Sequence, residues 1–516
     1  MVAAGGVQGQ RPIKHPQRPI EEPLRPTPHG RRRCLVLPAE AWAAAAALAL
    51  YAVTLGFGFV FDDRSLIGPE GPLALGNGTL PYRPLRYASY LLDHFVGGGA
   101  PWAYHAGNVA LHALVAALTA CIARRLGAAD GAAVLAGVAM AVHPLGVEAV
   151  AYVAGRRDLL ATAMGLLAIA SWLSPRGLTA VGVACALLAV AAKESGAVYV
   201  GVLALASIVG LGPSLWAART VLLAAAAAAI ALPVAYGAIG PALPSGPVCS
   251  LAAASTLLAT HYAVHMVAPL RLSIEYPALA RASTDCATLT SAASVAGFAL
   301  LGAAVGVVVA AFSRRGRSSS AAPLRFAWAW TGVTFVVCAT MVGMHEPGAD
   351  RHAYPLVAAA AIALAVSARP LLNWLPSTRR ALSAIAIAYV AALAMLSALR
   401  LPTWRDERAL WTAAVASAPE SGRAHHNLAG VLLAAGEHEA AATHVRAARD
   451  LDYAPAILGD AALACARGRI HRGRDLIERA RTHALPAAEI DAISAYCEKK
   501  GSDPFFPGKK GSDPFF

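Results

Sequence analysis

The chain has 516 residues, of which 57% are hydrophobic and 14% are charged, whereas a soluble domain has about 25% charged residues. This composition and a mean hydropathy of +0.54 exclude an ordinary soluble protein. They predict an all-α, polytopic bundle of membrane helices, because backbone groups inside a bilayer need internal partners. The net charge of +13 does not indicate a nucleic-acid partner, since the arginines cluster in short loops between apolar runs.

Residues 1–38 form a basic, proline-rich segment that ends its charged part at Arg31-Arg32-Arg33. Such a segment cannot bury a core, so we expect a disordered cytoplasmic arm. The apolar run 39–60 follows it and is long enough to cross a bilayer. Because the arginines hold the N-terminus inside, Asp62 and Asp63 are expected on the outer face.

Two further segments continue the predicted membrane domain, 39–400. The stretch 82–92 reads as an amphipathic helix that lies along the membrane interface. The apolar run 104–123 opens with His105, Asn108 and His112, whose spacings of three and four residues place them on one helix face. These side chains are either site residues or ordinary hydrogen-bonding groups between helices.

Later apolar runs bring the expected number of membrane helices to eleven to thirteen. The run 132–152 carries His143 and Glu148 and ends at Gly155-Arg156-Arg157-Asp158, and another run ends at Lys193-Glu194. Residues 240–285 contain an apolar stretch, 250–270, whose flanks both resemble outer loops. This stretch is predicted to be a re-entrant or broken helix, which leaves the number of crossings open. The eight cysteines have no spacing typical of metal sites or of a disulfide framework.

The predicted loops differ in charge on the two sides of the membrane. Inner loops are almost purely basic, whereas the outer loops mix both signs. The outer charged residues are Asp62, Asp63, Arg83, Arg86, Arg156, Arg157, Asp158, Lys193, Glu194, Glu346, Asp350 and Arg351. Outer arginines oppose the usual topology bias, so we expect either an anion-binding site or salt bridges between helix ends.

The composition changes after Pro402 to that of a soluble helical region. Small residues recur 32 positions apart, as Gly436, Ala441 and Ala448 and then Gly468, Gly473 and Ala480. A period near 34 is typical of tetratricopeptide repeats, so residues 403–485 are predicted to offer a concave surface for a peptide or partner protein. Counting the predicted membrane crossings from the inner N-terminus places these repeats on the outer face, the same face as Asp62. Residues 486–516 form a tail that contains the sequence KKGSDPFF twice, and we expect it to be disordered or to act as a docking peptide.

Four blocks of sequence resemble a known family. They are Phe61-Asp62-Asp63, then Arg83-Pro84-Leu85 with Tyr104-His105, Asn108 and His112, then His143-Pro144, Glu148-Ala149-Val150-Ala151 and Gly155-Arg156-Arg157-Asp158-Leu159-Leu160, and Lys193-Glu194-Ser195-Gly196. In this order they resemble the transmembrane and tetratricopeptide-repeat protein O-mannosyltransferases, within the GT-C glycosyltransferases. Asp350-Arg351-His352-Ala353-Tyr354-Pro355 resembles a later motif of the family but departs from it by an Asp for Glu and a missing Leu.

The resemblance implies an inverting glycosyltransferase that moves a sugar, mannose in this family, from a polyprenyl phosphate to Ser/Thr hydroxyls on the outer face. Asp62 is expected to be the base, with Asp63 orienting it or holding a divalent metal, although their order can be reversed. The predicted phosphate-binding residues are Arg83, Arg86, Arg156, Lys193 and Arg351. The predicted supporting residues are His105, Asn108, His112, His143, Glu148, Asp158, Glu194 and Asp350.

Several alternatives stay open at this point. One is a GT-C transferase that acts on a lipid or glycan, and another is a non-enzymatic membrane scaffold that works through its repeats. His261 and His265 lie one helical turn apart, but the glutamate of a zinc hydrolase is absent between them, which favours packing or donor contact. The expected location is the inner membrane of a bacterium, with the acceptor protein recruited by the repeats.

Overall fold

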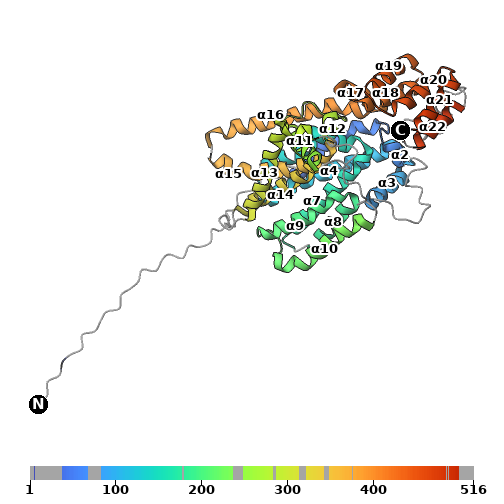
Figure 1. The fold of residues 1–516 in the computed structure, drawn as a ribbon. Coiled ribbons are helices and arrows are strands. Elements are labelled where there is room, and N and C mark those ends of the chain that lie inside the picture. The colour runs from blue at the N-terminus through green and yellow to red at the C-terminus, as the bar shows by residue number, and fades with distance from the viewer. Residues whose placement is uncertain are drawn as a thin grey trace. The chain divides into compact units, whose positions relative to one another are not determined.

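A computed structural model of the chain describes residue 5 and residues 38–67, 83–176, 179–235, 248–282, 286–312, 321–341, 348–374, 376–483, 485 and 487–498. Every regular element in these ranges is a helix, which confirms the all-α prediction. The described residues from Pro38 onward belong to one compact unit (Figure 1). The basic arm before residue 38 and the duplicated tail sequence lie outside the described residues.

Within the part of the chain that the structure describes, six helical segments are long and apolar enough to cross a membrane. They are Ala39–Gly56 (α1, Ala39–Tyr51, with η1, Ala52–Gly56), Pro101–Arg125 (α4), Ala292–Phe312 (α13), Ala322–Ala339 (α14), Asp350–Trp374 (η8, Asp350–Ala353, with α15, Tyr354–Trp374) and Pro376–Trp404 (η9, Pro376–Thr378, α16, Arg379–Arg400, and η10, Leu401–Trp404). A seventh span results if α5 (Asp130–Val142) and the segment Pro144–Ala151 are counted together across their 48° bend. The bend falls at Pro144, because proline lacks the N–H that a continuous helix needs.

The remaining apolar helices of the bundle are shorter or less hydrophobic. They are α7 (Arg156–Trp172), α8 (Thr179–Ala192), α9 (Val198–Ile208), α10 (Leu215–Ala235) and α11 (Val248–Val267). The expected total of eleven to thirteen crossings requires most of them to span the bilayer as well, and it stays a prediction. The stretch that we expected to be re-entrant or broken forms the continuous 20-residue helix α11, followed by the short α12 (Pro277–Ala282).

Short elements at the breaks between long helices carry most of the predicted motifs. These elements are α2 (Asp63–Ile67), η2 (Pro144–Gly146), α6 (Val147–Ala151), η3 (Val153–Gly155) and η4 (Glu194–Ala197). The predicted amphipathic helix forms α3 (Pro84–Gly97), with Leu92, Phe95 and Val96 exposed on one side. Polar residues thus gather where the helices stop, and the apolar residues occupy the helix interiors.

The C-terminal region consists of six helices that follow α16 (Figure 1). They are α17 (Glu407–Ser417), α18 (Gly422–Ala434), α19 (His438–Asp450), α20 (Ala456–Ala466), α21 (Ile470–Arg481) and α22 (Ala487–Glu498). The pairs α18–α19 and α20–α21 form two successive hairpins. Gly436 and Gly468 lie at equivalent turns with φ of +78° and +74°, a conformation that favours glycine. The 32-residue spacing therefore has a structural cause, while membership of the tetratricopeptide class stays a prediction.

Two disulfides correct the expectation that the cysteines form no framework. Cys249 bonds to Cys286, and Cys465 bonds to Cys497. The partners are 37 and 32 residues apart, and only helix packing brings them together. The second bond joins α20 to α22 and closes the C-terminal region.

Candidate functional site

The acidic motif forms a turn directly after the first membrane helix. Phe61 has a φ of +54°, Asp62 is exposed, and the side chain of Asp63 is completely buried. Asp63 Oδ1 accepts a hydrogen bond from the backbone N–H of Ala154 at 2.7 Å, and Oδ2 accepts from Val60 at 3.1 Å and Val153 at 3.4 Å. The two adjacent acids therefore differ: Asp63 fastens the turn to η3, and Asp62 is exposed to solvent.

Burial raises the pKa of Asp63 well above its usual value, although its backbone hydrogen bonds lower it. Its carboxylate oxygens already accept backbone N–H groups, and a metal ion would have to displace them. Among the described residues no group of three His, Cys, Asp or Glu side chains is arranged to hold a metal. The donor set around Asp63 does not fit a metal ion, so no catalytic step is derived through one.

Arg156 lies at the centre of a buried polar network. Its Nε donates to Asn108 Oδ1 at 2.7 Å, and its other nitrogens donate to Asp93 and to the carbonyl oxygen of Tyr104. Asn108 in turn donates to the carbonyl oxygens of Val150 and Tyr152, at 3.0 and 3.1 Å. Because this guanidinium is surrounded by acceptors of the protein itself, the geometry favours a structural role for Arg156 over the predicted phosphate contact.

Four cations, Arg83, Arg157, Lys193 and Arg351, form a group that we call the cationic cluster. Lys193 Nζ lies 2.6 Å from Asp158 Oδ1, and Arg157 Nε lies 3.6 Å from Asp158 Oδ2. Arg157 interacts electrostatically with Arg351 and with Arg83. Sequence reasoning placed Arg157 in an outer loop but not in the site, and its position next to Arg156 was the available signal.

Acidic partners accompany the other members of the cluster. Arg83 makes a two-point contact with Glu194, with both N···O distances at 2.9 Å. Arg351 forms an ion pair with Glu148, which also accepts the backbone N–H of Arg351 at 3.2 Å. The structure thus brings together residues that are far apart in sequence, and Asp158, Glu194 and Glu148 each pair with a predicted cation.

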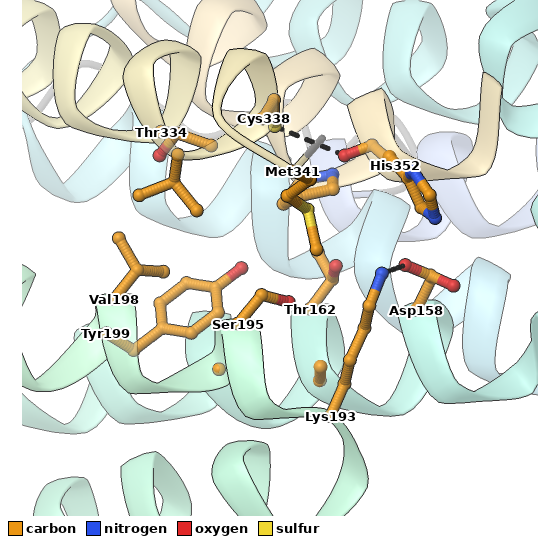
Figure 2. A pocket seen from close by; sticks show the side chains of 14 residues that line it. Asp158, Thr162, Lys193, Ser195, Val198, Tyr199, Thr334, Cys338, Met341 and His352 are labelled. Carbon is orange, nitrogen blue, oxygen red and sulfur yellow. Dashed lines mark hydrogen bonds and ion pairs between the residues drawn. The ribbon is translucent and has the colours of Figure 1, made fainter. Parts of the chain in front are cut away.

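Two cavities border this cluster. The larger has a volume of about 370 Å³ and is lined by Asp158, Lys193, Thr162, Tyr199 and His352, among others. Figure 2 shows Lys193 directed toward Asp158, with His352 facing them from another element. Both ring nitrogens of His352 are buried without a hydrogen-bond partner. Sequence reasoning did not select His352, although it belongs to the motif at 350–355.

The second cavity lies beside the acidic motif and has a volume of about 240 Å³. Phe61, Glu148, Arg351, Trp404 and Trp411 are among its lining residues. Phe61 immediately precedes Asp62, and Arg351 belongs to the cationic cluster. This cavity therefore lies between the first residue of the acidic motif and Arg351.

The remaining predicted site residues make contacts between elements. His105 contacts the carbonyl oxygen of Gly58 at 3.3 Å, and His112 bridges Tyr354 and Ala141. These contacts of His105 and His112 are hydrogen bonds between different segments of the chain, as the second of the two predicted alternatives expects. His143 accepts from the backbone N–H of Leu145 at 3.2 Å and so caps η2.

Asp350 and Arg86 are the last two of the predicted site residues. Asp350 Oδ2 lies 2.5 Å from Arg400 Nη2, and Oδ1 accepts from the hydroxyl of Tyr276 at 2.8 Å. His261 also lies 3.8 Å from Asp350. Arg86 donates to the hydroxyl of Tyr87 at 2.7 Å, and its buried Nε has no hydrogen-bond partner. Asp350 is thus joined to α16, whereas Arg86 keeps one buried donor unused.

Comparisons with known proteins identify relatives over part of the chain. The protein O-mannosyl-transferase Tmtc2 of Drosophila melanogaster is 38% identical over 147 residues, which are 25% of this chain and 16% of that protein. The human protein O-mannosyl-transferase TMTC2 is 35% identical over 164 residues, 28% of this chain and 20% of that protein. Human TMTC1 is 34% identical over 169 residues, 28% of this chain and 19% of that protein.

No protein-family model matches the chain, and no solved structure matches it. The chain spans only about a fifth of the length of the curated relatives that it matches. Within that range, several relatives at 30–38% identity share one family name. Together with the six apolar spans found in the described residues, this partial similarity supports a relationship to a TMTC-like family.

Proposed function

We propose that the chain is an integral-membrane glycosyltransferase that transfers a sugar from a polyprenyl phosphate to a Ser/Thr hydroxyl of a protein. The observation that carries this proposal is the cavity lined by Phe61 and Arg351, since it lies between the residue that precedes Asp62 and one member of the cationic cluster. The relatives are named protein O-mannosyl-transferases, which makes mannose the first sugar to test.

The proposed reaction is a single displacement with inversion, as the family resemblance implies. The carboxylate of Asp62 takes the proton of the acceptor hydroxyl while that oxygen forms a bond to the anomeric carbon. The bond from this carbon to the phosphate oxygen breaks, and its electron pair leaves with the polyprenyl phosphate. Arg351, Lys193 and Arg157 stabilise the charge that develops on the leaving phosphate. The cations lie in a buried setting, where such stabilisation is stronger than in water.

The two acids have unequal parts in this proposal. Asp63 is buried and holds backbone N–H groups of η3, so it positions the turn. Asp62 is exposed and is the acid that a hydroxyl from outside can reach. The difference in exposure supports Asp62 as the base. In this proposal Asp63 does not contact the acceptor.

The same proposal places the site on an oxidising face of the membrane. Disulfides persist in oxidising compartments and are rare in reducing ones. Cys249–Cys286 and Cys465–Cys497 therefore support an outer position for both the C-terminal region and the loop after α11. The expected bacterial membrane has no support from the relatives named above, which come from animals.

The test is transfer from a labelled polyprenyl-phosphate sugar in membranes that contain the full-length protein. We expect Asp62→Ala to abolish transfer, and Asp63→Ala to reduce both transfer and the yield of folded protein. A third variant, Arg408→Ala, lies in the C-terminal region and serves as a control with normal transfer. Normal transfer by both aspartate variants would exclude the mechanism, and label in lipid or glycan instead of protein would change the acceptor class.

A further inference from the structure

The first helix of the C-terminal region contacts the acidic turn directly. The backbone N–H of Phe61 donates to Glu407 Oε1 at 2.8 Å, although 346 residues separate them. The other carboxylate oxygen, Oε2, accepts from the indole N–H of Trp411 at 2.9 Å. The backbone N–H of Gly58 donates to the carbonyl oxygen of Arg405 at 3.0 Å. Helix α17 and Arg405, two residues before it, therefore hold both sides of the turn.

Phe61 needs such support because of its backbone conformation. Its φ of +54° is uncommon for a residue with a side chain, and such conformations persist where the surroundings fix them. The Phe61 ring lies 5.5 Å from that of Trp411 and 5.7 Å from that of Tyr152, between centroids. The guanidinium of Arg423 lies 5.6 Å from the ring centroid. Residues of the C-terminal region thus hold this ring together with the bundle.

The conformation of Phe61 determines where the next two side chains lie. Asp62 is exposed and Asp63 is buried, and a change of φ at Phe61 would redirect both. Glu407 is 7% exposed, so its hydrogen bonds are shielded from water. Removing its carboxylate would leave the N–H of Phe61 and the indole N–H of Trp411 without these acceptors.

Helix α17 is capped by its own segment, and the start of α18 is joined to the bundle. The carboxylate of Asp406 caps it by accepting the N–H of Ala409 at 2.9 Å. A second connection comes from Glu275 in the loop after α11, which accepts from Arg423 at 2.7 Å and from Ser421 at 3.2 Å. The C-terminal region is therefore joined to the bundle at two places near the acidic turn.

We propose that Glu407 is a positioning residue of the transferase, which holds Phe61 in its left-handed conformation and so directs Asp62 toward the acceptor. The inference rests on the proposed function. It makes α17 part of the active site, so a protein truncated at residue 403 lacks a component of the site as well as its repeats. Acceptor recruitment and catalysis then cannot be separated by that truncation.

The experiment compares full-length variants in lipid nanodiscs by initial rates of transfer to a Ser/Thr peptide. We expect Glu407→Ala to lower kcat by about 10- to 100-fold, the range typical of outer-shell positioning groups, with the KM for the donor within about twofold. Glu437→Ala is the matched control, because this exposed glutamate belongs to the same region and pairs with Arg408. Its kcat is expected to stay normal.

A rescue series tests the hydrogen bond itself. In Glu407→Gln the amide oxygen can accept the N–H of Phe61, but the amide nitrogen opposes the indole N–H of Trp411. Trp411→Phe removes that donor and keeps a ring against Phe61. The double variant is therefore expected to have a higher kcat than Glu407→Gln and to approach Trp411→Phe alone. A double variant no better than Glu407→Gln overturns the assigned hydrogen-bond arrangement.

Hydrogen exchange of the peptide that contains residues 57–63 gives a readout independent of activity. Glu407→Ala is expected to speed this exchange, and Glu437→Ala is not. Normal kcat and normal exchange in Glu407→Ala overturn the positioning role. If Asp62→Asn keeps full transfer, the proposed function fails instead, and faster exchange in Glu407→Ala would still establish the contact. A poorly folded Glu407→Ala leaves the rescue series to decide.

Discussion

The membrane bundle and the C-terminal region use charged residues in opposite ways. In the bundle, the pair Lys193–Asp158 has side chains that are 2% and 3% exposed, and Arg351–Glu148 is similarly buried. In the C-terminal region, Arg408–Glu437 is 54% and 39% exposed. A buried pair must offset a large loss of hydration, whereas an exposed pair contributes little. Buried pairs are therefore weak evidence for stability, and we propose that the bundle retains its charges for the transfer reaction.

The first prediction tests this contrast where the effect is largest. Glu148→Gln leaves the buried guanidinium of Arg351 without its full ionic partner, and loss of one partner in such a pair typically destabilises by about 3–5 kcal/mol. The expected result is a strongly lowered thermal midpoint in detergent. The double variant Glu148→Gln/Arg351→Gln removes both charges and should regain part of the stability while transfer stays lost. A double variant that regains transfer would contradict the role of Arg351.

The second prediction concerns the disulfide of the C-terminal region. Cys465→Ala/Cys497→Ala removes a cross-link whose partners are 32 residues apart, and disulfides of this kind stabilise by about 2–4 kcal/mol. We expect earlier unfolding of α20–α22 by limited proteolysis, with the bundle unaffected. The variant Cys121→Ala, which changes a cysteine that is free in the structure, is the control. Equal protease resistance of all three proteins would show that helix packing alone holds this region.

The third prediction concerns the carboxylate of Asp406, which caps the N-terminus of α17. Loss of an N-cap acceptor costs about 1 kcal/mol, so Asp406→Ala should lower the stability of the C-terminal region modestly. Partial burial raises the pKa of Asp406, but the hydrogen bond from the N–H of Ala409 and the neighbouring Arg405 outweigh this effect. The net pKa of Asp406 is therefore lower than its usual value. Its stabilisation is therefore present above the unfolded pKa of about 4 and disappears as the pH falls through the lowered folded value. The wild-type advantage over Asp406→Asn should shrink below about pH 4, and a growing advantage would reverse this sign.

The smallest expected effect on stability belongs to the exposed ion pair Arg408–Glu437 of the C-terminal region. Arg408→Ala and Glu437→Ala each break an exposed ion pair, and such pairs contribute about 0–1 kcal/mol. Their thermal midpoints and that of the double variant are expected to differ little from wild type, and less still at high salt. A loss as large as that of Glu148→Gln would remove the distinction between the two regions.

Sequence alone predicted the helical class, because hydropathy reflects the bilayer directly, while the outward position of Asp62 and Asp63 stays a prediction. It also grouped most of the cationic cluster, through the charges at the outer helix ends. It could not assign different roles to Arg156 and Arg157, because these roles depend on which guanidinium forms the hydrogen bond to Asn108. Nor could it relate Phe61 to Glu407, because a contact across 346 residues has no local pattern.

The central claim is that the exposed acid at the end of the first membrane helix takes the acceptor proton beside the cationic cluster. Its most direct test is single-turnover transfer from labelled polyprenyl-phosphate mannose by purified Asp62→Asn, which preserves the size of the side chain. The account predicts folded protein with normal donor binding and a transfer rate reduced by about 10²- to 10⁴-fold, as expected for loss of a general base. A rate equal to that of wild type would contradict it.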